Sequence, residues 1–300
     1  MIHRKMTVGT VVFNVINIAV FTAFTLLCIF PFYYIFINTI SNNTAVSLGK
    51  VLFYPIGVHF NNYVEVLSLG GIGRAAFVSL ARTVIGTLLT LLGSAFLGYA
   101  FSRAEYWRRK LWYRFVVIAM YFNAGLIPWF ILVVRLGLYD TFLIYVLPSM
   151  IVPFNVILFK TFIEQIPPAL EESAQIDGAN YPVRFFRIIL PLSLPIIATI
   201  AVFSSVGQWN AFMDTLLFIQ TQSLRPLQYL LYEYLSRLDA LANLMRTSAG
   251  RRQITNIEHI MTPTAIRMTI SFIVVVPILF VYPFLQRFFV KGIMIGAIKG

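Results

Sequence analysis

Long hydrophobic runs separated by polar segments make up most of this chain. A helix of about 20 apolar residues crosses a bilayer, and six runs reach that length. The predicted spans are 12–37, 75–101, 111–134, 141–163, 191–214 and 264–286. Pro31 should kink the first span, and Pro148 and Pro153 should break the fourth. The pattern predicts an all-α, polytopic membrane protein. No span could satisfy its own polar groups alone, so residues 1–300 are expected to form a single domain.

A polar segment, residues 164–190, interrupts this pattern between the fourth and fifth spans. It opens with the prolines 167–168, and proline suits the first turn of a helix. Glu171 and Glu172 would then lie in that first turn, where the helix dipole favours acidic side chains. Gly178 predicts a left-handed end to this helix.

A second short helix is predicted over residues 182–190, starting at Pro182. Neither short helix is long enough to cross a bilayer. The segment therefore predicts either a compact helix–Gly–helix knob between two spans or an ordinary interfacial loop. We call residues 164–190 the knob.

The composition excludes a soluble protein. Of the 300 residues 59% are hydrophobic and only 11% are charged, with a mean hydropathy of +0.82, whereas soluble domains carry about 25% charged residues. The net charge of +12 is not a sign of nucleic-acid binding, because the basic residues lie mostly at span ends. Arg82, near the start of the second span, is expected to extend to the membrane interface.

The distribution of positive charge predicts the orientation. Six spans place both termini on one side of the membrane, together with the knob. The basic residues on that side are Arg4, Lys5, Arg103, Arg108, Arg109, Lys110, Arg114, Arg184, Arg187, Arg287, Lys291 and Lys299. The short connections of the other side offer Lys50, Arg74 and Arg135. The positive-inside rule therefore predicts cytoplasmic termini and a cytoplasmic knob.

Motifs for catalysis or metal binding are absent from the sequence. It contains no G-x4-G-K-[ST] phosphate-binding loop and no G-x-S-x-G nucleophile elbow. His3, His59 and His259 are scattered, and Cys28 is the single cysteine, so neither a metal site nor a disulfide is expected. We predict a chain without enzyme activity and without a bound cofactor. Any ATP hydrolysis would belong to another polypeptide.

Polar side chains at membrane depth are candidates for a translocation path. The densest group lies in the predicted fifth span, where amides and a carboxylate flank a flat aromatic ring: Gln208, Trp209, Asn210 and Asp214. Sugars need this combination of hydroxyl partners and a stacking surface. Asn155 and Asn123 are weaker candidates. The alternative for all six is hydrogen bonding between helices.

Two motifs resemble a known family. The spacing E-S-A-x-x-D-G-A-x5-F-x-x-I-x-L-P-x3-P, from Glu172 to Pro195, resembles the EAA coupling motif of ABC importer permeases, with Ser173 where alanine is usual. The resemblance implies that the knob docks into a cleft of a separate ATPase subunit and transmits its closure to the spans. The residues that it implicates in coupling are Glu171, Glu172, Ala174, Asp177, Gly178, Ala179, Arg184, Phe185, Leu190 and Pro191.

The ending from Gln286 to Gly300 resembles the carbohydrate-uptake branch, the maltose-type (MalG-like) permeases, and Ser223–Leu227 matches a short motif of that branch. The resemblance implies a tail that reaches between the ATPase subunits and a last outer loop, 215–263, that faces the binding protein. The tail residues concerned are Gln286, Arg287, Lys291, Gly292, Gly296, Lys299 and Gly300. The basic ones also suit anchoring to anionic lipid. The loop is longer than in the maltose type, with 238–262 extra, which fits larger or acidic oligosaccharides.

Together these features predict the membrane permease of an ABC sugar importer. The resemblance implies a second, homologous permease, two ATPase subunits that hold ATP and magnesium, and an extracellular or periplasmic sugar-binding protein. Two alternatives remain at this point. One is an importer permease for another solute, such as a peptide or polyamine. The other is a membrane enzyme for a lipid-linked substrate, which would need acidic or histidine clusters at one interface.

Overall fold

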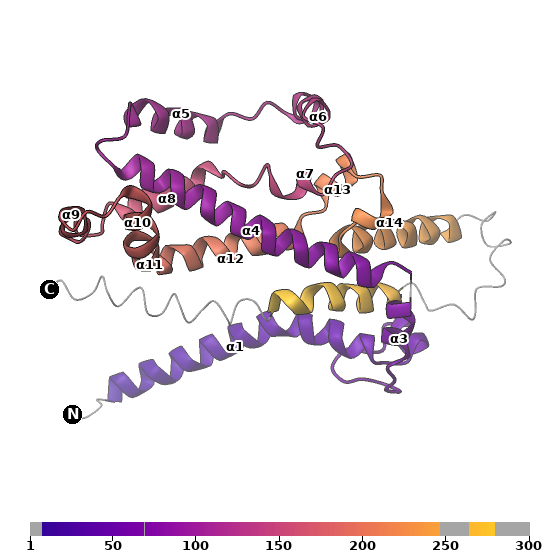
Figure 1. Ribbon diagram of the computed structural model, residues 1–300. Coiled ribbons are helices and arrows are strands. Elements are labelled where there is room, and N and C mark those ends of the chain that lie inside the picture. The colour runs from indigo at the N-terminus through magenta and orange to yellow at the C-terminus, as the bar shows by residue number, and fades with distance from the viewer. Residues whose placement is uncertain (1–7, 69, 247–263, 280–300) are drawn as a thin grey trace. The chain divides into compact units, whose positions relative to one another are not determined.

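The computed structural model describes residues 8–68, 70–246 and 264–279 (Figure 1). These residues form helices and connecting loops, and no strand occurs among them. Backbone contacts divide the chain into two compact units. Among the described residues, the first unit combines 8–68 with 234–246 and 264–275, and the second combines 70–233 with 276–279.

The first unit begins with the long helix α1, Val8–Thr39. Its side chains are mostly apolar on every face, and those before residue 34 are exposed in the isolated chain. A helix that is apolar all round needs lipid or another protein around it. Pro31 lies inside the helix without ending it. The short helices α2, Asn43–Ser47, and α3, Asn61–Ser68, follow.

The end of α1 is fixed by hydrogen bonds to α3. The Asn62 amide donates to the Thr39 carbonyl at 2.9 Å, and the Thr39 and Tyr63 hydroxyl groups are 2.6 Å apart. Asn42 caps α2 by accepting from the N–H groups of Thr44 and Ala45. These bonds satisfy backbone groups that a helix end leaves free.

The second unit contains most of the helices. They are α4 (Ile72–Ser102), α5 (Arg109–Tyr121), α6 (Leu126–Arg135), α7 (Leu143–Val146), α8 (Pro153–Ile163), α9 (Ala169–Ile176), α10 (Tyr181–Arg184), the π-helical turn η1 (Phe185–Ile189), α11 (Leu190–Leu192), α12 (Leu194–Asn210), α13 (Met213–Phe218) and the 3-10 turn η2 (Gln222–Leu224). Helix α14, Leu227–Arg246, starts in this unit, and a further helix covers Thr264–Leu279.

The described helices only partly match the six predicted spans. By length and composition α1 and α4 could each cross a membrane, and a third crossing exists if Tyr181–Leu192 and Leu194–Asn210, bent by 79°, count as one. The third predicted span, 111–134, is wrong as a single helix. It divides into α5 and α6 at residues 122–125, where Gly125 has a φ of +84°. A positive φ ends a right-handed helix.

The predicted break of the fourth span is confirmed, because the span divides into α7 and α8, with Pro148 in the break and Pro153 starting α8. Two other boundaries differ from the prediction. The predicted fifth span ends early, because α12 stops at Asn210 and Asp214 belongs to α13. The predicted outer connection, 215–263, contains the 20-residue helix α14, and its residues 247–263 lie outside the described part of the chain.

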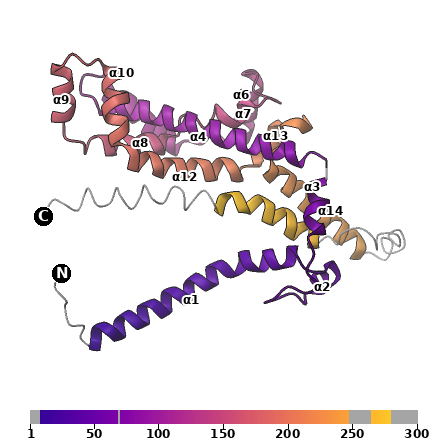
Figure 2. The ribbon, with the colours of Figure 1, turned by 60° about the horizontal axis from the view of Figure 1, so that its bottom comes forward.

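Helix α4 is the axis of the second unit and packs along both α8 and α12 (Figures 1 and 2). Its buried face is rich in small residues, which allow a close approach. A Cβ atom on Gly98 would lie 2.6 Å from Cβ of Phe159, and one on Gly93 would lie 2.4 Å from the carbonyl oxygen of Met150. Tyr99 packs in the core cluster that contains Phe159, Phe185 and Ile200.

We predict that Gly98→Ala destabilises the protein, since the new methyl group would overlap Phe159. The expected cost is about 1–3 kcal/mol, the usual range for overpacking. Gly73→Ala, on the same helix but with open space around its Cβ, is the matched control. It should be neutral or stabilise by up to about 1 kcal/mol, because alanine is the better helix former. Thermal unfolding of the purified membrane complex measures both. Equal midpoints for Gly98→Ala and wild type would contradict the close packing of α4 on α8.

Candidate functional site

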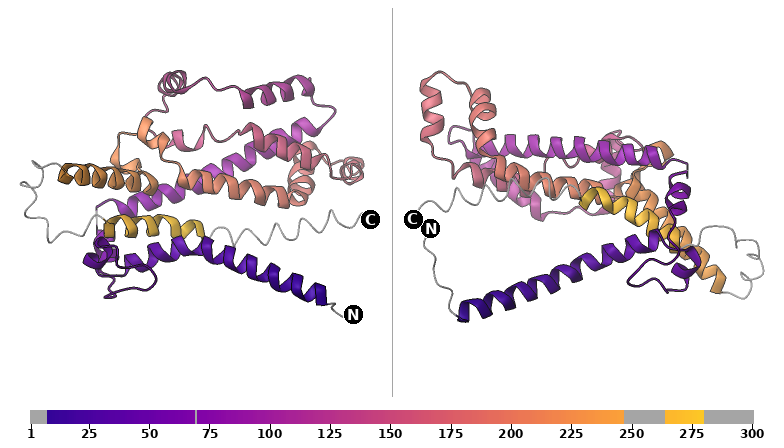
Figure 3. Two further views of the ribbon diagram at one scale, coloured as in Figure 1. Left: turned by 180° about the vertical axis from the view of Figure 1, so that it is seen from behind. Right: turned by 90° about the horizontal axis from the view of Figure 1, so that it is seen from below.

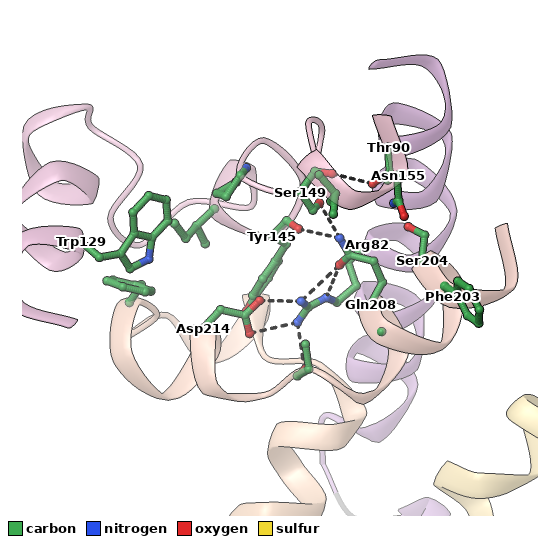
Figure 4. Close-up of a pocket in the computed structure, with 16 residues that line it drawn as sticks. Arg82, Thr90, Trp129, Tyr145, Ser149, Asn155, Phe203, Ser204, Gln208 and Asp214 are labelled. Atoms are coloured by element: carbon green, nitrogen blue, oxygen red, sulfur yellow. Dashed lines mark hydrogen bonds and ion pairs between the residues drawn. The ribbon is translucent and has the colours of Figure 1, made fainter. Parts of the chain in front are cut away.

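A cavity of about 470 Å³ opens between α4, the segment before α8, and the ends of α12 and α13 (Figure 4). Charged, hydroxyl, amide and aromatic side chains line it together. The principal ones are Arg82, Thr90, Trp129, Tyr145, Ser149, Asn155, Ser204, Gln208 and Asp214. All of them belong to the second unit.

Arg82 of α4 is the centre of this site. Its guanidinium forms an ion pair with Asp214, with 2.5 Å between Nη2 and Oδ2, and also donates to Gln208 Oε1 at 3.3 Å and to the Ala211 carbonyl at 3.1 Å. With the second bond to Asp214, at 3.3 Å, each of its five N–H donors has an acceptor. The group also lies 4.2 Å from the ring centre of Tyr145, within the range of a cation–π interaction.

The predicted extension of Arg82 to the membrane interface is wrong. The residue is 1% exposed and its side chain points into the second unit. Its partner could not be identified from the sequence, because Asp214 lies 132 residues away. Without acceptors a buried guanidinium would be very costly, and the paired carboxylate removes that cost.

The break between α12 and α13 positions two of the groups that accept hydrogen bonds from Arg82, the Ala211 carbonyl and the Asp214 carboxylate. Helix α12 ends at Asn210 and Ala211 is extended, which directs the Ala211 carbonyl at Arg82. Asp214 then lies in the first turn of α13, where the helix dipole stabilises a carboxylate. Its Oδ1 also accepts from the N–H of Thr215 at 2.8 Å.

Gln208 connects Arg82 to Tyr145 and Ser149, in the part of the chain before α8. Its Nε2 donates to the Tyr145 carbonyl at 3.1 Å and to Ser149 Oγ at 2.7 Å, while its Oε1 accepts from Arg82. Gly86 of α4 makes room for it, because a Cβ there would lie 2.6 Å from the Gln208 amide nitrogen. Gln208 therefore forms hydrogen bonds between helices and lines the cavity at the same time.

The cavity brings together only some of the predicted path residues. Gln208, Asp214 and Asn155 line it, whereas Trp209, Asn210 and Asn123 are not among its lining residues. Trp209 is buried and Asn210 is exposed. The Asn123 side chain accepts from the Gly125 N–H at 2.9 Å and so supports the break between α5 and α6.

Trp209 does not line the cavity, but other aromatic side chains do. Trp129 of α6 and Tyr145 of α7 line it from one side (Figure 4). Sequence reasoning missed both residues and also Arg82. Arg82 carried a signal, since an arginine inside an apolar run needs a partner. Trp129 carried none, because tryptophan is ordinary in a membrane helix.

The knob consists of two short helices joined at Gly178. Helix α9 ends there with a left-handed backbone, φ +82°, and the N–H of Ala179 returns to the Ala174 carbonyl at 2.9 Å. Asn180 caps α10 by accepting from the Val183 N–H. The helical path continues through η1 to Pro191, which has no N–H for the preceding turn.

The knob projects at one end of α4 (Figures 2 and 3), the end that carries Tyr99 and Arg103. Of the predicted coupling residues, Glu172, Asp177, Gly178 and Pro191 are exposed, Ala174, Ala179 and Leu190 are half-buried, and Glu171, Arg184 and Phe185 are buried. Ile176, at the tip, is 87% exposed. The predicted tail residues, Gln286, Arg287, Lys291, Gly292, Gly296, Lys299 and Gly300, lie outside the described residues.

Comparison with known proteins gives concordant matches. Residues 90–295 match the family model for the binding-protein-dependent transport system inner membrane component. Protein LplC of Bacillus subtilis is 36% identical, over 96% of this chain and 95% of its own. The polygalacturonan/rhamnogalacturonan transport system permease protein YtcP of the same species is 34% identical, over 92% of this chain and 94% of its own.

A solved structure shares the fold as well. It is a bacterial ABC transporter involved in the import of the acidic polysaccharide alginate, and the matching chain is 26% identical with a TM-score of 0.81. The match covers 95% of this chain and 99% of that chain.

We predict that Asp214→Asn destabilises the protein by roughly 2–5 kcal/mol, because it leaves the Arg82 charge buried without a counter-charge. The double variant Arg82→Met with Asp214→Leu should recover much of this loss, since an apolar pair removes both desolvation costs. Glu164→Gln is the matched control. It breaks the exposed pair of Lys160 and Glu164 and should cost less than about 1 kcal/mol. The unfolding midpoints of the purified complex, measured for the wild type and for these variants, test the expected changes in stability. A stable Asp214→Asn variant would show that Arg82 does not need its partner.

Proposed function

This chain belongs to the family of binding-protein-dependent transport system inner membrane components, and we propose that its cavity is part of the route by which an imported sugar crosses the membrane. The chain is a permease subunit of an ABC importer for sugars and is itself non-catalytic. The substrates that we propose are oligosaccharides, including fragments of acidic polysaccharides. Support comes from relatives named for polygalacturonan/rhamnogalacturonan transport and for alginate import.

The observation that carries the proposal is the chemistry of the cavity lining. Ser149, Ser204 and Asn155 offer hydroxyl and amide groups to sugar hydroxyls, and the ring of Trp129, which is 37% exposed, offers a flat surface. A volume of about 470 Å³ lies within the range of small-ligand sites. The space available is therefore large enough for part of an oligosaccharide chain.

The membrane arrangement that we propose has six spans with both termini and the knob in the cytoplasm. The asymmetry of basic residues supports this orientation. The exposed apolar surface of α1 supports contact with lipid or with a second, homologous permease. The relatives match almost the whole chain, which supports one permease domain over residues 1–300.

We further propose that the knob is the coupling element for two ATPase subunits that hold ATP and magnesium, and that the outer connection, 215–263, faces an extracellular or periplasmic sugar-binding protein. The fixed spacing from Glu172 to Pro195 supports the first assignment. So does the exposure of Glu172 and Ile176, which leaves the tip of α9 accessible to a partner. The length of the outer connection supports the second assignment, because long connections are usually functional. For the C-terminal residues 286–300 we propose contact with the ATPase subunits.

The coupling role predicts the effect of Gly178→Val. No atom lies within 4 Å of the position of a Cβ on Gly178, so the substitution acts through backbone strain at φ +82° alone. A left-handed residue other than glycine costs about 1–2 kcal/mol, and a β-branched one costs more. Sugar uptake should fall about tenfold or more, while insertion into the membrane is unchanged.

Gly178→Asn is the matched control, because asparagine tolerates a left-handed backbone. Its uptake should lie between those of Gly178→Val and wild type. Uptake of radiolabelled sugar and the amount of permease in the membrane are measured for all three. Wild-type uptake by Gly178→Val would exclude the knob as the coupling element.

The cavity assignment predicts protection by substrate. In a Cys28→Ser background, Ser204→Cys and Asn155→Cys should react with a small hydrophilic thiol reagent, and sugar with its binding protein should change the rate. Asn123→Cys, outside the cavity, should react at a rate that sugar does not alter. If sugar does not change the reaction rates of the cysteines at 204 and 155, these residues serve helix packing and not the translocation path.

A further inference from the structure

Glu171 behaves unlike the acid beside it. Both residues lie in the first turn of α9. Glu172 is exposed, as expected of a surface that meets a partner, but Glu171 is only 5% exposed. Its carboxylate turns toward the end of α4, so it is not available to an ATPase subunit.

Three side chains from two other elements surround that carboxylate. The Tyr99 hydroxyl of α4 donates to Oε1 at 2.6 Å, and Arg103, directly after α4, forms an ion pair with Oε2. Arg184 of α10 approaches Oε1 at 3.6 Å and also donates to Gln175 of α9 at 2.9 Å. The cluster thus joins both helices of the knob to one end of α4.

The burial of this cluster makes the attachment strong. A carboxylate kept from water needs charged or hydrogen-bonding partners, and separating it from them would leave a buried charge unpaired. Swinging the knob away from α4 would cost that pairing. By contrast, an exposed pair such as Lys160 with Glu164 separates at little cost.

The covalent path from the knob into the bundle contains a bend. The helical segment Tyr181–Leu192 meets Leu194–Asn210 at 79°, and movement of the knob could be absorbed there. Helix α4 has no such break between Tyr99 at the knob end and Arg82 in the cavity, about 25 Å away along a straight helix. A knob fixed to α4 would therefore move the cavity wall directly.

We propose that Glu171 is a positioning residue that fastens the knob to α4, so that displacement of the knob reaches the cavity through Arg82. This inference rests on the proposed coupling function of the knob. It assigns to Glu171 a task different from that of the exposed Glu172, and it gives Tyr99 and Arg103 a part in coupling although both lie outside the EAA-like motif.

The first test measures the attachment without transport. A nitroxide on Ile176→Cys, in a Cys28→Ser background, reports the mobility of the knob tip in the purified complex with its ATPase subunits. Glu171→Gln should increase that mobility, and Tyr99→Phe, which keeps the ring and loses one hydrogen bond, should increase it less. Lys160→Gln, which breaks an exposed ion pair from the α8 side and lies outside the knob, should leave it unchanged.

The second test measures sugar transported per ATP hydrolysed in proteoliposomes with binding protein. Glu171→Gln should lower this ratio by about tenfold, the factor that corresponds to one charged hydrogen bond, while the ATPase subunits still co-purify. Arg103→Gln should lower it as well, and the double variant should lose little more than either single variant, because both changes break one link.

The outcomes separate this inference from the proposed function. If Gly178→Val abolishes coupling but Glu171→Gln retains wild-type mobility and a wild-type ratio, the attachment is overturned and the coupling role of the knob stands. If Gly178→Val transports normally, the proposed function itself fails. Fully additive losses for Glu171→Gln and Arg103→Gln would also overturn the attachment.

Discussion

A charge buried in an apolar bundle needs a partner, and α4 carries two sites where this requirement is met. At one end Arg82 is held by a carboxylate, an amide and a backbone carbonyl, and at the other end Tyr99 and Arg103 hold Glu171. Each site joins α4 to a different region, α12 and α13 in the first case and the knob in the second. The directional bonds at the two ends fix how these regions attach to one helix, which apolar packing alone would not specify.

Small residues make these attachments geometrically possible. Between the two polar sites, Gly86, Gly93 and Gly98 allow Gln208, Met150 and Phe159 to approach the α4 backbone more closely than any side chain would permit. Dispersion contacts over such a close interface hold helices together in lipid. The lipid tails are as apolar as the side chains, so burying those side chains gives no hydrophobic driving force. Glycine thus serves in the middle of α4 through its size, whereas Gly178 serves the knob through its backbone freedom.

Local patterns predicted the all-helical class, the position of α1 and α4, and the helix–Gly–helix build of the knob, because apolar periodicity, proline and glycine act on neighbouring residues. They could not predict which side chains meet across the chain. Arg82 and Asp214 lie in different predicted spans, and the inward turn of Glu171 depends on Tyr99 and Arg103, far away in sequence.

The break at residues 122–125 was missed because Gly125 stands in an otherwise continuous apolar run. Of the residues expected to face a substrate, Gln208, Asp214 and Asn155 line the cavity. Asp214 does so because α12 ends before Ala211 and the chain then turns back toward α4.

The pairing of Arg82 with Asp214 also determines the electrostatic character of the cavity. A cation and an anion 2.5 Å apart form a dipole whose field decays much faster than that of a single charge. A sugar in this cavity would therefore meet almost no net fixed charge, even where the sugar is itself acidic. Its residence time would depend on hydroxyl bonds and ring contacts, which break readily, and would change little with ionic strength. Weak binding of this kind suits a translocation path, because the path must release the substrate that enters it.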